Sequence, residues 1–254
     1  MNRNIALLRG SGSTRKYETY EFEINDNATL LDVLELLRTG KVPDLSYRHS
    51  CHHGSCGTCA VRVNGREVLA CLTPVSSLYT EEGKIPKVDP LAVLQPLADL
   101  AVDPAILFSA QPEGSGTLRK SEWREGIQVK EAEDDAPVIS GPKDAPDIAN
   151  GPVRFEDCIE CGSCVSACPV LRGGTGDNRG TADFMGPAAL TAIHREYIKE
   201  PDKRETLLEQ AGKPRGVAAC KRYIECSRVC PRAVYPAKHI EMMRQELQKK
   251  LTRM

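Results

Sequence analysis

Eleven cysteines are the residues of this 254-residue chain whose type and spacing could do chemistry, and they fall into three groups. Cys51, Cys56 and Cys59 have the spacing C-x4-C-x2-C, and Cys71 follows after eleven intervening residues. A disulfide scaffold would have a higher cysteine density, about 8–10% of residues, and cysteines scattered over its loops. The bunched spacing therefore predicts metal ligation by thiolates.

The first group has the spacing of a plant-type 2Fe-2S site. Gly54 and Gly57 allow tight turns that direct backbone N–H groups toward the sulfur atoms. A structural zinc site and free thiols are the alternatives, although zinc ligands usually come as two C-x2-C pairs. His52 and His53 suggest a Rieske centre, in which histidines replace two cysteines. Because four cysteines already suffice, we interpret both histidines as surface residues.

The second and third groups repeat one another. The run from Cys158 to Cys168-Pro169 has the pattern C-x2-C-x2-C-x3-C-P of bacterial ferredoxins, whose fourth cysteine ligates the other cluster. The run from Cys220 to Cys230-Pro231 matches it position for position, except that Tyr223 stands where a cysteine is expected. The crossover predicts these ligand sets: Cys158, Cys161, Cys164 and Cys230 for one cluster; Cys168, Cys220 and Cys226 for the other.

The first of these sets is complete and predicts a 4Fe-4S cluster. The second has three thiolates, and the protonated phenol of Tyr223 is a poor replacement for the fourth. We therefore predict a 3Fe-4S cluster, which lacks one iron corner. The alternative is that the substitution abolished this cluster altogether.

The bulk composition excludes several other classes of function. The formal net charge is -1, which favours neither nucleic acid nor an anionic membrane surface as a partner. The longest apolar passage, from Val88 to Phe108, contains three prolines and three aspartates, so we expect no membrane span. The N-terminal residues lack the apolar core of a secretory signal, and we expect a cytoplasmic chain.

The N-terminal part is predicted to be a small α+β unit. Alternating residues 20–24 indicate a half-buried strand, and Thr29 to Asp32 resembles a capping box that starts a helix ending near Gly40. Asn64-Gly65 predicts a type I′ hairpin, with Cys71 at the end of its return strand.

The rest of the chain divides into a polar connector and a helical part. Residues 111–152 are rich in proline, glycine and acidic residues and are expected to lie on the surface without a core of their own. Beyond them, two apolar stripes predict amphipathic helices whose stripes belong to the core: Leu190, Ile193 and Tyr197; Ile240, Met243, Leu247 and Leu251.

Together these motifs resemble the iron-sulfur subunit of succinate dehydrogenase and fumarate reductase, the complex II family. The likeness covers nearly the whole chain and includes the segments 47–51, 63–65, 69–74 and 184–190 beside the three cysteine groups. It implies an α+β chain: an N-terminal β-grasp plant-type 2Fe-2S ferredoxin domain over residues 1–110, the connector 111–152, and an all-α bacterial-ferredoxin-like domain over 153–254.

The resemblance also implies a function. The chain would have no substrate site and would carry electrons through 2Fe-2S, 4Fe-4S and 3Fe-4S clusters, between the FAD of a flavoprotein subunit and a quinone at a membrane anchor. It would serve the respiratory chain or the tricarboxylic acid cycle. It would lie at the cytoplasmic face of the inner or plasma membrane, held there by its partner subunits.

Two departures from the family concern the quinone side. The tryptophan that succinate dehydrogenases place shortly after the first Cys-Pro is replaced by a segment containing Arg172, and the only tryptophan is Trp123. Lys221 stands where those enzymes commonly have histidine. Arg172 and Lys221 are candidates for donating to a quinone, or are solvated surface charges.

The departures leave three alternatives to a succinate dehydrogenase open. One is a menaquinone-linked fumarate reductase, and another is a complex II-like module with a non-quinone partner, such as a thiol/disulfide couple or another flavoprotein. The third is a zinc-stabilised binding protein without a redox role. The sequence leaves the physiological direction of the reaction open as well.

Overall fold

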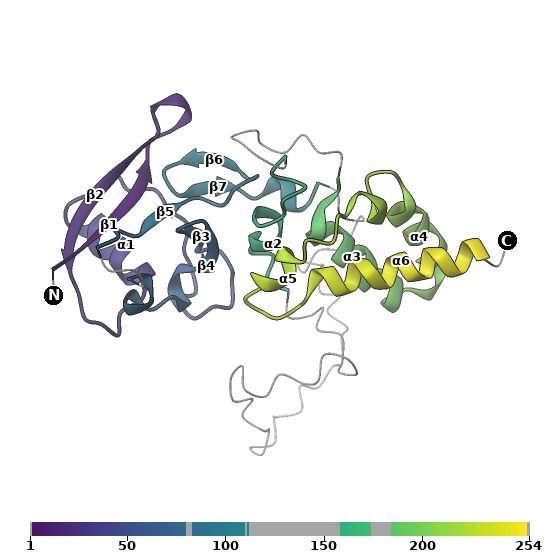
Figure 1. Ribbon diagram of the computed structural model, residues 1–254. Helices are drawn as coiled ribbons and strands as arrows, with labels where there is room; N and C mark the ends of the chain where they lie inside the picture. The colour runs from purple at the N-terminus through teal and green to yellow at the C-terminus, as the bar shows by residue number, and fades with distance from the viewer. Residues whose placement is uncertain (1, 80–82, 110, 112–157, 174–183, 253–254) are drawn as a thin grey trace, which may run out of the picture.

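The computed structural model describes residues 2–79, 83–109, 111, 158–173 and 184–252. The predicted connector, apart from Gln111, lies outside the described residues, and so does Trp123. A sheet-rich part and a helical part lie at opposite ends of the molecule, with the short helices α2 (Ser163–Ser166) and α5 (Glu225–Arg228) between them (Figure 1).

The sheet-rich part has five strands in the order β2-β1-β5-β3-β4. Strand β1 pairs antiparallel with β2 and parallel with β5. Helix α1 (Leu30–Thr39) buries its apolar side in the core that this sheet also lines, which completes the predicted β-grasp arrangement. The strand bounds are β1 Asn2–Arg9, β2 Lys16–Glu23, β3 Ala60–Val63, β4 Arg66–Leu69 and β5 Lys87–Asp89.

Local signals explain where α1 begins and how β3 joins β4. The backbone N–H of Thr29 donates to the Asp32 carboxylate at 2.7 Å and the N–H of Asp32 donates back to the Thr29 hydroxyl at 3.3 Å, so the predicted capping box is present. Asn64 and Gly65 have φ of 49° and 85°, as a type I′ turn requires. The prediction for Cys71 is wrong: β4 ends at Leu69, and Cys71 lies in the 3-10 turn Ala70–Leu72.

The apolar passage between Val88 and Phe108 connects the two parts. It contains the hairpin of β6 (Gln95–Ala98) and β7 (Ala101–Asp103), which the sequence patterns did not predict. Leu91, Leu94 and Leu107 are buried and lie against Gly162 of the helical part. Within the described ranges, we find no helix whose length and apolar content would allow it to cross a bilayer.

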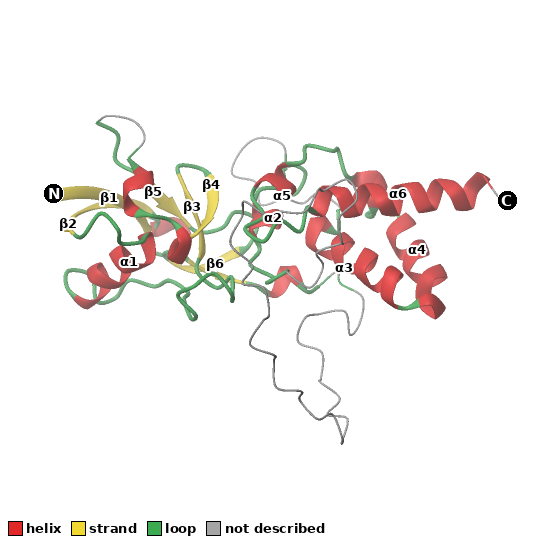
Figure 2. Ribbon diagram, turned by 90° about the horizontal axis from the view of Figure 1, so that it is seen from below, coloured by secondary structure: helices red, strands yellow, loops and turns green. Residues whose placement is uncertain are grey.

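The helical part contains the predicted stripes on α3 (Gly186–Lys199) and α6 (Pro236–Thr252). These helices pack together, and α4 (Arg204–Gly212) packs against both (Figure 2). Ile193, Ile240 and Met243 are fully buried, as predicted. Leu251 is exposed near the end of α6, so the prediction that it belongs to the core is wrong.

Candidate iron-sulfur sites

The loop between Cys51 and Cys59 wraps its sulfur atoms in backbone and hydroxyl donors. The N–H groups of Ser55 and Cys56 each donate to Cys51 Sγ at 3.3 Å, and the Thr58 hydroxyl donates to Cys56 Sγ at 3.0 Å. Gly54 and Gly57 have φ of 79° and 69°, so the two glycines make the turns that aim these donors inward.

The fourth sulfur of this group comes from outside the loop. Cys71 Sγ lies 3.4 Å from Cys59 Sγ, and both side chains are buried. Backbone N–H groups, that of His53 foremost, lower the pKa of the Cys51 thiol to about 6, whereas burial raises the pKa of Cys59 to about 12. The loop therefore stabilises the thiolate form of Cys51, whereas the buried thiol of Cys59 requires a nearby cation in order to ionise. This donor set fits iron.

The second group lines a cavity in the helical part, to which Leu107 and Gln111 also contribute. Its sulfur atoms come from Cys158, Cys161, Cys164 and Cys230. Burial raises the pKa of Cys158 to about 11 and raises that of Cys164 further. Buried thiols that resist deprotonation by themselves become good ligands when a metal cation compensates the thiolate charge, so this set also fits iron.

The third group lines a separate cavity beside α6. Cys168, Cys220 and Cys226 contribute sulfur atoms, and Tyr223 and Lys221 form part of the same wall. Burial raises the pKa of Cys226 to about 12. Tyr223 has 55% of its surface exposed. Among the described residues, this cavity thus offers three sulfur atoms, which are those expected from the spacing.

The backbone of the second and third groups repeats as the sequence does. Helices α2 and α5 occupy equivalent positions, and the residues flanking them have matching positive φ angles. Ile224, at φ 60°, occupies a left-handed conformation that costs a β-branched residue about 1–2 kcal/mol. The matching pairs are Glu160 with Arg222, Gly162 with Ile224, and Gly173 with Tyr235. The loop shape is therefore retained without the fourth cysteine, even at positions where it is strained.

The three groups follow one another closely. A Cβ placed on Gly57 of the first loop would lie 2.6 Å from the Cβ of Cys161, so the first and second groups touch. Helix α2, which carries Cys164, packs against α5, which carries Cys226, so the second and third groups are neighbours.

The two candidate quinone-side residues lie in different places. Lys221 is exposed and lines the third cavity. The Arg172 guanidinium binds the buried carboxylate of Glu67 in β4, and its Nε donates to the carbonyl oxygen of Ser166 at 2.5 Å. A quinone contact stays a prediction for both residues, but the contacts of Arg172 join the helical part to the sheet.

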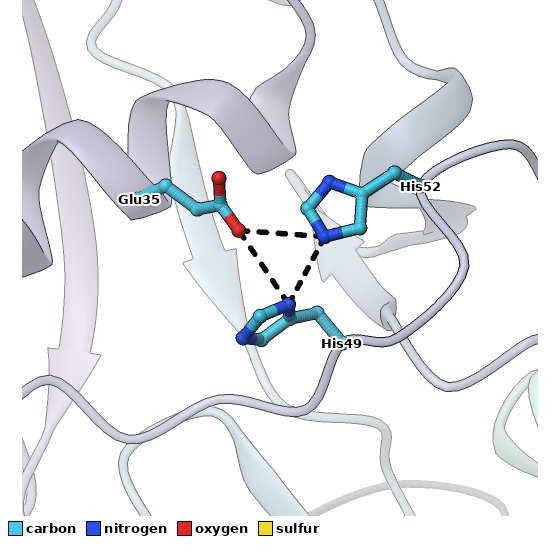
Figure 3. A group of neighbouring side chains, drawn as sticks. All are labelled: Glu35, His49 and His52. Atoms are coloured by element: carbon cyan, nitrogen blue, oxygen red, sulfur yellow. Dashed lines mark hydrogen bonds and ion pairs between the residues drawn. The ribbon is translucent and has the colours of Figure 1, made fainter.

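His52 and His53 are exposed, as the sequence interpretation expected. That interpretation nevertheless missed one cluster of side chains. Glu35, His49 and His52 point toward one another beside the first cysteine loop (Figure 3). The spacing His49-x-x-His52 is a signal that could have indicated the pair. Glu35 comes from α1, so only the fold brings it to the histidines.

Comparisons with known proteins bear on the family. Residues 4–109 match a 2Fe-2S iron-sulfur cluster binding domain, and residues 154–234 match a 4Fe-4S dicluster domain. A fumarate reductase iron-sulfur subunit of Wolinella succinogenes is 30% identical over 233 residues, which are 91% of this chain and 89% of that protein. The chain belongs to the iron-sulfur subunits of the fumarate reductase and succinate dehydrogenase family. The predicted general function is thereby confirmed: this family member is an electron-transfer subunit of an oxidoreductase.

Two other similar proteins extend the comparison. A subunit of the fumarate reductase (CoM/CoB) of Methanothermobacter marburgensis is 29% identical over 246 residues, which are 95% of this chain but 43% of that protein. The Mycobacterium smegmatis Sdh1 complex in the apo form contains a chain with the same fold, with a TM-score of 0.71 at 23% identity. That match covers 98% of this chain and 96% of the other, and it agrees with the predicted fold class.

Proposed function

We propose that this chain relays single electrons between the FAD of a flavoprotein subunit and a quinone at a membrane anchor. The observation that supports the relay is a row of three adjoining sulfur groups. Gly57 of the first loop lies against Cys161, and the helices that carry Cys164 and Cys226 pack together. Iron-sulfur clusters, when bound, supply one-electron chemistry to such a row. The protein supplies the spacing and the surroundings of each site.

The donor sets support a specific assignment of ligands. Four thiols surround the first and second sites, which suits 2Fe-2S and 4Fe-4S clusters, and three surround the last, which suits 3Fe-4S. The assigned ligands are Cys51, Cys56, Cys59 and Cys71 for 2Fe-2S; Cys158, Cys161, Cys164 and Cys230 for 4Fe-4S; and Cys168, Cys220 and Cys226 for 3Fe-4S.

The retained backbone supports a cluster at the third site. Ile224 and Arg222 have left-handed conformations that glycine adopts more easily. Backbone strain of this kind is typical of functional sites, so it supports a third site that still binds a cluster. The phenol of Tyr223 is a poor ligand beside thiolates and lies largely exposed. We infer that Tyr223 stands beside the corner where a fourth iron would lie and does not act as a ligand there.

The third cavity is also the proposed exit for electrons. Lys221 lies on its wall next to Cys220, where its ammonium group could donate to a quinone carbonyl oxygen and stabilise negative charge there. The flavoprotein would then dock at the sheet-rich end, near the first group. Both partners would hold the chain peripherally at the cytoplasmic face of the inner or plasma membrane.

A second candidate has a thiol/disulfide couple or another flavoprotein in place of the quinone. The Methanothermobacter relative, a fumarate reductase named for CoM and CoB, favours this alternative. In that case Lys221 would face a partner protein rather than a quinone.

Anaerobic purification of the native complex tests the proposal. We expect about nine irons per chain, from clusters of two, four and three irons, together with a flavoprotein, an apolar anchor subunit and quinone-dependent activity. Full clusters with no anchor, and activity with thiols instead of quinones, would establish the second candidate. Fewer than about six irons per chain after reconstitution would overturn the three-cluster relay.

A further inference from the structure

Glu35, His49 and His52 form a compact triangle of metal-binding atoms next to the first cysteine loop (Figure 3). His49 Nδ1 lies 3.2 Å from His52 Nε2, and each of these nitrogens lies 3.5 Å from the same Glu35 oxygen, Oε1. We propose that this triangle is a binding site for a divalent transition metal, best suited to Zn²⁺. The site is separate from the eleven cysteines.

The size of the triangle favours zinc. Ligand atoms about 2.0–2.1 Å from Zn²⁺ at the corners of a tetrahedron lie about 3.3–3.4 Å from one another. Adjacent ligands of an octahedral iron or manganese ion would lie closer, at about 3.0 Å. The edges of the triangle, at 3.2, 3.5 and 3.5 Å, match the tetrahedron. Three protein ligands leave the fourth corner for water, as in open zinc sites.

The surrounding residues hold the triangle in shape. The centre of the Tyr47 ring lies 5.1 Å from the centre of the His49 ring. The Arg38 guanidinium in turn lies 5.2 Å from the centre of the Tyr47 ring. His52 has a positive φ of 62°, a left-handed conformation that is uncommon among non-glycine residues, and its ring points toward Glu35 of α1. Helix α1 fixes the backbone of Glu35.

The three side chains are also accessible to a metal ion from solution. Their exposed fractions are 25% for His49, 33% for Glu35 and 44% for His52. Partial exposure leaves an entry path, and neutral histidine with carboxylate is a common zinc donor set. Without a metal, a hydrogen bond between His49 Nδ1 and His52 Nε2 would hold the two rings together, and zinc would replace that hydrogen bond.

Zinc binding would have a consequence for the neighbouring cluster. His52 follows Cys51 directly in the chain, so a dication held by the triangle lies close to a proposed 2Fe-2S ligand. Positive charge favours the reduced, more negative cluster. We therefore expect occupancy to shift the midpoint potential of the 2Fe-2S centre upward. This consequence rests on the proposed ligation, whereas zinc binding itself does not.

The test uses untagged, anaerobically purified protein with its clusters in place. Equilibrium dialysis against micromolar ZnCl₂ should give one zinc per chain with no loss of iron. Zinc X-ray absorption should show nitrogen and oxygen neighbours at about 2.0–2.1 Å and no sulfur at about 2.3 Å. Glu35→Gln, His49→Asn and His52→Asn should each weaken binding more than about tenfold, while His53→Asn, which changes an imidazole outside the triangle, should not.

Several outcomes would overturn the site. These are the absence of saturable binding, zinc-sulfur scattering, iron release in step with zinc uptake, or equal affinity in the triad variants and in His53→Asn. EPR-monitored titration of the 2Fe-2S centre with and without ZnCl₂ checks the redox consequence separately. An unchanged 2Fe-2S potential at full zinc occupancy would overturn the redox consequence but not the zinc site. Zinc binding in a protein that lacks the three clusters would contradict the relay but not the zinc site.

Discussion

The hydroxyl of Ser166, on α2, donates to the buried carboxylate of Glu67, on β4, across 2.7 Å. Ser166 also accepts the backbone N–H of Ala92 at 2.8 Å, and Arg172 binds the same carboxylate oxygen of Glu67. A buried polar contact therefore joins the helical part to the sheet. Because such a group is costly to leave unpaired, the contact restricts how the two parts can be arranged.

Replacing Arg172 tests this contact. We expect Arg172→Leu to lower the free energy of unfolding by about 1–3 kcal/mol, since it leaves a buried carboxylate with weaker compensation. Arg228→Leu is the control, because Arg228 pairs with Glu225 at side-chain exposures of 62% and 37% and should change stability by less than about 1 kcal/mol. Anaerobic urea unfolding measures both. Unchanged stability with a loss of quinone reduction would instead assign Arg172 to the quinone side.

The packing of Gly57 on Cys161 gives a second prediction. Gly57→Ala introduces a Cβ 2.6 Å from that of Cys161, in a residue with φ 69°. Gly65→Ala is matched, because its φ is 85° but the nearest atom would be 3.8 Å away. Backbone strain lowers the stability of both by about 1–2 kcal/mol, and overpacking removes about 1–3 kcal/mol more from Gly57→Ala. Equal losses in thermal unfolding would show that the two loops do not touch in solution.

Tyr223 gives a third prediction, which is spectroscopic. The oxidised protein should show a near-isotropic EPR signal slightly above g = 2, as a 3Fe-4S centre gives. Tyr223→Cys restores the fourth ligand of the repeat, so that signal should disappear after reconstitution, and the iron content should rise by about one per chain. Tyr223→Phe removes only the hydroxyl and should keep the signal. Retention of the signal in Tyr223→Cys would contradict the proposed role of this position.

The buried pair His194 and His239 predicts a pH dependence of stability. Burial favours the neutral form of both rings. His239 Nε2 lies 3.0 Å from the carbonyl oxygen of Val234 and donates to it, and in the neutral ring Nδ1 then accepts from His194 Nδ1 at 3.0 Å. Burial lowers the pKa of His194 to about 4 and that of His239 to about 3.

The direction in which stability changes with pH follows from proton uptake on unfolding. Between pH 6.5 and about 4, the unfolded chain binds protons at these histidines and the folded chain does not, so stability is full above pH 6.5 and falls as the pH is lowered. We expect the two histidines together to lower the free energy of unfolding by about 2–3 kcal/mol between pH 7 and 5.5. Urea unfolding at each pH should show this slope in the natural protein and a shallower one in the double variant His194→Leu, His239→Leu. Identical slopes would place the proton uptake elsewhere.

The sequence by itself determined the features that depend on neighbours along the chain. The capping box at Thr29 and the Asn64-Gly65 turn formed as predicted because their hydrogen bonds and φ angles are local. The cysteine spacing was equally informative, since a cluster requires several sulfur atoms within one short loop. The ligand sets that the repeat predicts stay predictions, but the structure places the thiols of one such set, Cys230 and Cys158 among them, around one cavity.

Tertiary structure decided everything that joins distant segments. Only the fold could show that Gly57 lies against Cys161, that Arg172 binds Glu67, and that Glu35 meets His49 and His52. Leu251 fits the apolar stripe of α6 but lies exposed, because periodicity defines a helix face without saying how far the neighbouring helices extend. Local patterns therefore specified the loops that hold sulfur, whereas packing between the two parts set the order and closeness of the sites.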